Sequence, residues 1–218
     1  MMKAGIFDMD GLMIDSERAS YECYKKYMNN LGMDMTVEFY KTLLGQTVAI
    51  CKEKFLREYG ENFPYEECVK TMHKMLNQQF VTEGVPIKKG LIELLKYLKE
   101  NNFKTMVATS SARNRVDIIL NQAGVMKYFD DTICGDEVKN GKPNPEVFLK
   151  ACDKLKINPN EALVLEDSEA GIQAAFGGGI DVVCVPDMKY PDEKYQKMSK
   201  AICKDLFDVK TYIEECCQ

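Results

Sequence analysis

The sequence predicts an α/β protein, a doubly wound parallel sheet (Rossmann-like core) with an inserted helical cap domain. From about Pro86 onward, short apolar runs alternate with amphipathic helical patterns, which is typical of parallel βαβ units. The first apolar run, Ala4 to Phe7, is separated from that region by residues 16–85, whose pattern is helical throughout. We therefore expect an α/β core of residues 1–15 and 86–218, and a helical cap of residues 16–85.

The predicted cap has the residue spacing of several helices. Ser16 is suited to cap a helix that continues to Leu31. Apolar residues from Val48 to Tyr59 recur at steps of three and four, as on one face of a helix. Residues 66–80 repeat the pattern after a proline. We find no convincing strand in this block.

The predicted core elements follow one another in a regular order. Strands are expected at residues 105–109, 132–135, 162–166 and 180–185. Helices are expected at residues 90–101, 112–123, 145–156, 168–176 and 205–216. Gly177 to Gly179 follow a helix rather than open one, so we interpret them as a helix-to-strand turn and not as a phosphate loop.

Length, charge and cysteine use limit the possible classes of function. The 218 residues, 45% of them hydrophobic, are enough for one or two domains with a substantial core. A net charge of −5 argues against nucleic acid or an anionic membrane as a partner. No apolar run has the length of a membrane span and no signal peptide is recognisable, so we expect a cytoplasmic protein. The nine scattered cysteines lack metal-site spacing and are expected to be mostly buried thiols.

The most informative functional feature is a pair of aspartates, Asp8 and Asp10, directly after the first predicted strand. Open α/β sheets present functional groups at the carboxyl ends of their strands. Gly11 lets the backbone turn away from that edge. Two close carboxylates can share a divalent cation, or divide the roles of nucleophile and acid/base between them. Taken alone, the pair is equally compatible with an ordinary turn.

Three further polar segments lie beside predicted core elements. Thr109-Ser110-Ser111 and Glu166-Asp167-Ser168 each follow a strand, and Gly141-Lys142-Pro143-Asn144-Pro145 opens a helix. In this order, and with Asp8-Met9-Asp10-Gly11 before them, these segments resemble the haloacid dehalogenase superfamily of phosphotransferases. The resemblance extends from Asp8 to about Pro186.

The resemblance implies a chemical role for each motif. Asp8 matches the nucleophile, which forms an aspartyl-phosphate, and Asp10 matches the general acid/base. Ser110 matches the residue that holds the transferring phosphoryl group, and its neighbour Thr109 takes this role if the alignment is off by one. Lys142 matches the lysine that bridges the nucleophile and the phosphoryl oxygens.

The resemblance also implies a metal and a substrate. Asp167 and Glu166, together with Asp8 and Asp10, are the expected ligands of Mg²⁺, which prefers oxygen donors. The expected partner is a small phosphorylated metabolite, and we expect the chain to act as a monomer. The candidate substrate-binding residues are Glu17, Gly45, Gln46 and Thr47 in the cap, and Thr109 and Ser111 in the core.

Several activities remain open within and outside this superfamily. Asp10 argues against dehalogenation, because a halide leaving group needs no proton. The motifs are similar to those of β-phosphoglucomutase and of small-sugar phosphatases. Ser20 and Val48 stand about where such mutases have a histidine and an arginine, so we favour a phosphatase, with the mutase as the alternative. A phospho-aspartate receiver and a non-catalytic binding protein are less favoured.

Overall fold

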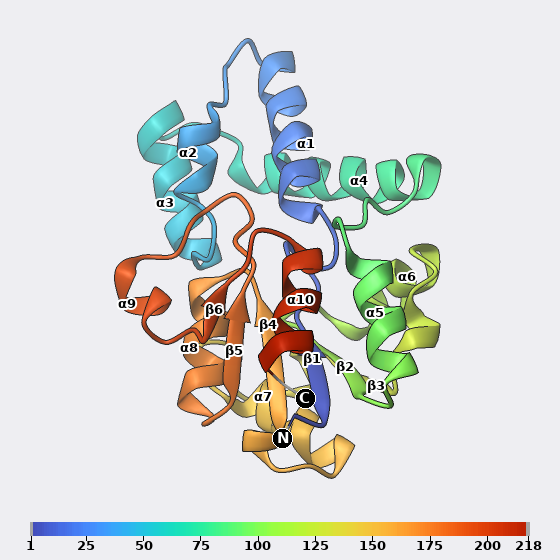
Figure 1. The fold of residues 1–218 in the computed structure, drawn as a ribbon. Helices are drawn as coiled ribbons and strands as arrows, with labels where there is room; N and C mark the ends of the chain where they lie inside the picture. Colours follow the sequence, from blue (N-terminus) through green and yellow to red (C-terminus); the bar gives the residue numbers. More distant parts are fainter. Residues whose placement is uncertain (1, 217–218) are drawn as a thin grey trace. The chain divides into compact units, whose positions relative to one another are not determined.

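A computed structural model describes residues 2–216, which divide into two compact units (Figure 1). Within the described residues, one unit comprises residues 2–15 and 85–216, and the other comprises residues 16–84. The second unit is thus inserted in the sequence of the first, directly after its first strand.

The first unit contains a parallel sheet, with β1 near its middle. In the described part of the chain the strand order is β3-β2-β1-β4-β5-β6, and every pairing is parallel. The strands are β1 (Ala4–Phe7), β2 (Lys104–Ala108), β3 (Asp131–Ile133), β4 (Ala162–Glu166), β5 (Asp181–Cys184) and β6 (Ala201–Ile202). Phe7 is paired with Val107 on one side and with Leu165 on the other. The residues that follow β1, β2 and β4 are therefore brought to one edge of the sheet.

Helices cover both faces of this sheet, as the doubly wound prediction requires (Figure 1). Ala4 and Ile6 point toward the face covered by α7 (Glu146–Leu155) and α8 (Glu169–Gly177), where they share one apolar cluster with both helices. The intervening residue of the strand, Gly5, faces α5. The remaining helices of this unit are α5 (Leu91–Glu100), α6 (Arg113–Gln122), α9 (Glu193–Gln196) and α10 (Leu206–Cys216). The α/β fold class is confirmed.

The second unit consists of helices α1 (Ser16–Asn30), α2 (Val37–Lys41), α3 (Val48–Tyr59) and α4 (Tyr65–Glu83), with no strand among its described residues. Its core contains an aromatic cluster around Phe55, which is 1% exposed. The Phe55 ring stacks on Phe63 with the centroids 5.3 Å apart, and meets Phe39 edge-on at 5.4 Å. These contacts join α2 and α3 to the turn that precedes α4.

The sequence patterns missed only short elements. α2, α9 and β6 are five, four and two residues long, which is too short for a hydrophobic period to show. The strand expected at residues 132–135 ends at Ile133 and is followed by the 3-10 turn η2 (Gly135–Glu137). Two other 3-10 turns are η1 (Met126–Tyr128) and η3 (Pro159–Glu161). Among the described residues, no helix has the length and apolar character needed to cross a membrane.

Candidate active site

Three charged side chains meet at the carboxyl end of the central strands. Asp8 follows β1, Glu166 ends β4, and Lys142 lies in the loop before α7. The Lys142 Nζ donates hydrogen bonds to Asp8 Oδ1 and to Glu166 Oε1, the second at 2.6 Å. The side chains of Lys142, Asp8 and Glu166 are only 6%, 9% and 0% exposed. One ammonium group therefore faces two carboxylates, and all three side chains are largely shielded from solvent.

This imbalance of charge affects the protonation of the cluster. Burial raises the pKa of Asp8 to about 7, and the charge of Glu166 adds to the rise, while the ammonium of Lys142 opposes it. Burial disfavours the ammonium form of Lys142, but the charges of Asp8 and Glu166 outweigh it and raise the pKa of Lys142. Lys142 therefore stays protonated, and with both carboxylates ionised the cluster carries one excess negative charge.

Glu166 is held in place by the start of α8. Its Oε2 accepts hydrogen bonds from the backbone N–H of Asp167 and Ser168 and from the Ser168 hydroxyl, each at 2.9 Å. Ser168 also caps the helix, because its Oγ accepts from the Gly171 N–H at 3.1 Å. A Cβ on Gly171 would lie 1.8 Å from Glu166 Oε1, so this position leaves room only for glycine. Both oxygens of Glu166 are thereby committed to the protein.

The second aspartate of the pair is also fixed by hydrogen bonds. The Ser111 Oγ donates to Asp10 Oδ2 at 2.7 Å. The Arg115 guanidinium donates to both carboxylate oxygens of Asp10, at 2.9 and 3.1 Å. Asp10 and Ser111 could be predicted from the sequence but Arg115 could not, because an arginine on a helix carries no signal of its own.

The hydroxyl residues after β2 differ in their surroundings. Thr109 is 2% exposed, and its Oγ1 accepts a hydrogen bond from the backbone N–H of Ser111 at 3.2 Å. Ser110, in contrast, is exposed. Of the two candidates for holding a phosphoryl group, Thr109 is the one whose orientation the protein fixes.

Two further carboxylates lie beside the turn after β1. Asp167, which directly follows Glu166, has a carboxylate oxygen within 4.8 Å of one from Asp187. A Cβ on Gly11 would lie 2.2 Å from Asp167 Oδ2, so the backbone of the first motif approaches this carboxylate closely. Asp187 accepts a hydrogen bond from Lys88. Asp187 was not among the predicted site residues, since an aspartate after a proline is also typical of a turn.

The candidate substrate residues outside the α/β unit occupy two places in the helical unit. Glu17 is the second residue of α1. Gly45, with a φ of +70°, and the exposed Gln46 lie between α2 and α3. Thr47 caps α3, because its Oγ1 accepts from the Ile50 N–H at 3.4 Å. These residues lie at helix starts and in a loop, which are common positions for binding residues.

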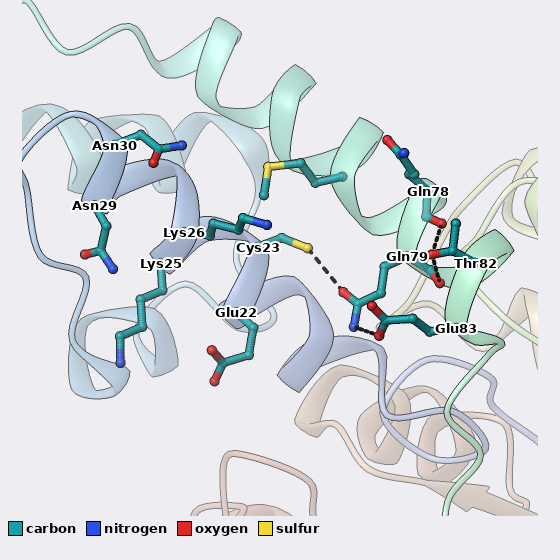
Figure 2. Close-up of a pocket in the computed structure, with 11 residues that line it drawn as sticks. Glu22, Cys23, Lys25, Lys26, Asn29, Asn30, Gln78, Gln79, Thr82 and Glu83 are labelled. Atoms are coloured by element: carbon teal, nitrogen blue, oxygen red, sulfur yellow. Dashed lines mark hydrogen bonds between the residues drawn. The ribbon is translucent and has the colours of Figure 1, made fainter.

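The helical unit also contains a cavity of about 650 Å³ between α1 and α4 (Figure 2). Figure 2 shows Cys23 directed at Gln79, whose Oε1 accepts a hydrogen bond from the thiol at 3.7 Å. The lining residues are Glu22, Cys23, Lys25, Lys26, Asn29, Asn30, Met75, Gln78, Gln79, Thr82 and Glu83. None of the candidate site residues is among them.

The arrangement of these motifs agrees with comparisons to known proteins. A family model described as "Haloacid dehalogenase-like hydrolase" matches residues 5–185. The chain belongs to this family. It is 32% identical over 185 residues to a phosphorylated carbohydrates phosphatase of Thermotoga maritima, with 83% of each chain covered. It is 28% identical to the validoxylamine A 7'-phosphate phosphatase of Streptomyces hygroscopicus subsp. limoneus, covering 96% of this chain and 97% of the other.

Solved structures in the family have the same fold. The chain is similar to the crystal structure of β-phosphoglucomutase from Clostridium difficile, with a TM-score of 0.72 and 27% identity. The match covers 99% of this chain and 96% of the other. The predicted resemblance to β-phosphoglucomutase-like members of the family is therefore confirmed.

Proposed function

We propose that this protein is a phosphatase that hydrolyses a small phosphorylated metabolite, such as a sugar phosphate, through an aspartyl-phosphate on Asp8. The observation that carries the proposal is the buried contact of Lys142 with both Asp8 and Glu166, next to a second, separately held aspartate. The relatives named as phosphatases of phosphorylated carbohydrates and of validoxylamine A 7'-phosphate support the reaction class and the size of the substrate.

The reaction proceeds in two steps on this set of residues. In the first, a carboxylate oxygen of Asp8 attacks phosphorus, the bond to the ester oxygen breaks, and Asp10 donates a proton to the departing alkoxide. In the second, Asp10 accepts a proton from water as the water oxygen attacks phosphorus, the bond between phosphorus and the Asp8 oxygen breaks, and inorganic phosphate and the Asp8 carboxylate are released. Lys142 offsets the negative charge of the phosphoryl oxygens, and the buried Thr109 donates its hydroxyl to them.

The residues at this edge fit a Mg²⁺ ion. Asp167 and Asp187 have carboxylate oxygens within 4.8 Å of each other, and Mg²⁺ prefers such donors. Asp8 follows β1 at the same end of the sheet as Asp167, whereas both oxygens of Glu166 are bound by protein groups. The excess negative charge around Lys142 also favours a cation. When bound, Mg²⁺ would offset the repulsion between the nucleophile and an anionic phosphate. We therefore propose Asp8, Asp167 and Asp187 as the ligands. Of the other two predicted ligands, Glu166 holds Lys142, and Asp10 has both carboxylate oxygens bound by Arg115 and Ser111.

The mutase alternative makes a different demand on the helical unit. A mutase has to hold a second phosphate while the aspartyl-phosphate forms, and a guanidinium is the side chain best suited to that task. Val48, at the start of α3, stands at the position we compared with the mutase arginine, and it is 76% exposed. An exposed valine contributes no charge, so the phosphatase is the better supported reaction. We propose that Glu17, Gly45, Gln46 and Thr47 contact the substrate.

Phosphorus NMR separates the two reactions in one sample. The protein is incubated with Mg²⁺, β-glucose 1-phosphate and a trace of the 1,6-bisphosphate, and then with a panel of other sugar and nucleoside monophosphates. Growth of the inorganic phosphate signal supports the phosphatase, and growth of glucose 6-phosphate supports the mutase. Asp8→Asn should abolish either signal without loss of the fold, which circular dichroism checks. Activity that persists in this variant would exclude Asp8 as the nucleophile.

A further inference from the structure

The carboxylate of Asp10 is held by a network of hydrogen bonds from Arg115 and Ser111. Arg115 donates from Nη2 to Oδ1 at 2.9 Å and from Nη1 to Oδ2 at 3.1 Å. Ser111 donates to Oδ2 at 2.7 Å, and Arg115 Nη1 also reaches the Ser111 Oγ at 3.2 Å. The three side chains thus form a closed ring of hydrogen bonds, with both Asp10 oxygens occupied.

This geometry fixes the plane of the Asp10 carboxylate. A guanidinium that binds both oxygens places its own plane and that of the carboxylate in line, which a lysine cannot do. Ser111 adds a third contact from the segment between β2 and α6. Arg115 is anchored independently, because it lies in the first turn of α6 and its backbone N–H donates to the Ala112 carbonyl at 3.0 Å.

The two aspartates of the first motif are therefore held by different cations. Asp8 contacts the buried ammonium of Lys142, whereas Asp10 and Arg115 are each 30% exposed. Orientation, rather than burial, is what Arg115 supplies to Asp10. General acid catalysis depends strongly on such orientation, because the proton must pass along a short line between two heavy atoms.

We propose that Arg115, supported by Ser111, is a positioning residue that orients Asp10 for proton transfer to the leaving group. The proposal rests on the proposed phosphatase function. It predicts that the importance of Arg115 depends on the leaving group of the substrate. An alkoxide leaves poorly without a proton, whereas the p-nitrophenolate of p-nitrophenyl phosphate leaves without one.

The test compares kcat/KM of Arg115→Met for two esters in the presence of Mg²⁺. One is a sugar phosphate that the wild type hydrolyses, and the other is p-nitrophenyl phosphate. For both esters, kcat/KM reports the steps up to transfer of the phosphoryl group to Asp8. General acid catalysis is typically worth about 10²–10⁴ in rate. Loss of orientation should therefore lower kcat/KM for the sugar phosphate by roughly 10- to 100-fold, and that for the aryl ester by less than about threefold.

Two further variants separate positioning from structure. Arg115→Lys retains the charge without the forked contact, and it should restore only part of the loss on the sugar phosphate. Arg113→Met is the matched control, because Arg113 lies in the same turn of α6 but contacts Thr132 and Glu137 instead of Asp10. It should not alter the ratio of the two kcat/KM values. Ser111→Ala should change the ratio in the same direction as Arg115→Met, and it replaces that variant if the latter does not fold.

The outcomes are distinct. An equal loss on both esters, or no loss on either, would overturn the positioning role. If Arg115→Met adds its full effect to that of Asp10→Asn, Arg115 does not act through Asp10 and the proposal fails. If the wild type hydrolyses neither ester nor any sugar phosphate, the proposed function itself fails, and that result is recognised before any Arg115 variant is assayed.

Discussion

Gly171 offers the sharpest test of how the α/β unit holds its charged cluster. A Cβ at this position would lie 1.8 Å from Oε1 and 1.9 Å from Cδ of Glu166. Rotation of the carboxylate alone cannot relieve the contact, because Cδ is in the way as well. In Gly171→Ala, Glu166 must move, and it then loses either the contact with Lys142 or the three hydrogen bonds to Oε2.

The expected cost follows from two opposing effects. Alanine is favoured over glycine inside a helix by about 1 kcal/mol. Loss of one partner from a buried ion pair costs about 3–5 kcal/mol. The difference is a net destabilisation of about 2–4 kcal/mol, which lowers the melting temperature of a chain of 218 residues by roughly 4–16 °C.

Gly177→Ala is the matched control in the same helix. A Cβ there would meet no heavy atom within 4 Å, so only the helix-propensity effect remains and the variant should be as stable as the wild type or more so. Thermal unfolding by circular dichroism and urea midpoints measure both variants. If Gly171→Ala melts within about 2 °C of Gly177→Ala, Glu166 is not confined as the structure indicates. Gly171→Ala should also lower phosphatase activity, since Lys142 loses an anchor.

Two other substitutions test local electrostatics and backbone shape. A backbone hydrogen bond from Lys139 is the main cause that lowers the pKa of Glu146 to about 2, so its ionised form stabilises the fold above about pH 4.5 and loses this effect as the pH falls toward 2. Glu146→Gln should therefore lower the urea midpoint at pH 7. If the difference in midpoint between wild type and variant does not shrink in acid, this explanation is wrong. Gly11→Ala should destabilise more than Gly179→Ala, because both have positive φ but only Gly11 meets a carboxylate, that of Asp167. Equal urea midpoints would rule out that contact.

The fold could be predicted because its central strands are apolar along most of their length. β1 and β4 are buried at every position, and such continuous runs are typical of parallel strands covered on both faces. Each run is followed by a polar motif, so the sequence also indicates which ends of the strands carry the chemistry. The register of β1 with β2 and β4 brings those motifs together. Their meeting could be predicted without that register, because functional groups in open α/β sheets gather at the carboxyl ends of the strands.

The contacts inside the site depend on the rotation of helices and the pairing of strands, which a single sequence does not give. Arg115 reaches Asp10 across 105 positions of the chain, and it does so only because α6 starts where it does and presents its first turn to that carboxylate. Asp187 lies near Asp167 because β5 is paired with β4. In both cases, the identity of the partner follows from the rotation of a helix or the pairing of a strand.

Which hydroxyl, that of Thr109 or that of Ser110, holds the phosphoryl group is also not decided by the sequence. Side chains alternate in direction along an extended chain, so a shift of one position replaces a group directed into the protein by one directed away from it. Both residues carry a hydroxyl, and sequence alone cannot decide between them. β2 ends at Ala108, and the chain continues with Thr109 buried and Ser110 exposed. A hydroxyl that is already held in place can stabilise a transferring phosphoryl group without first being ordered, and this is our reason for proposing Thr109 beside the predicted Ser110.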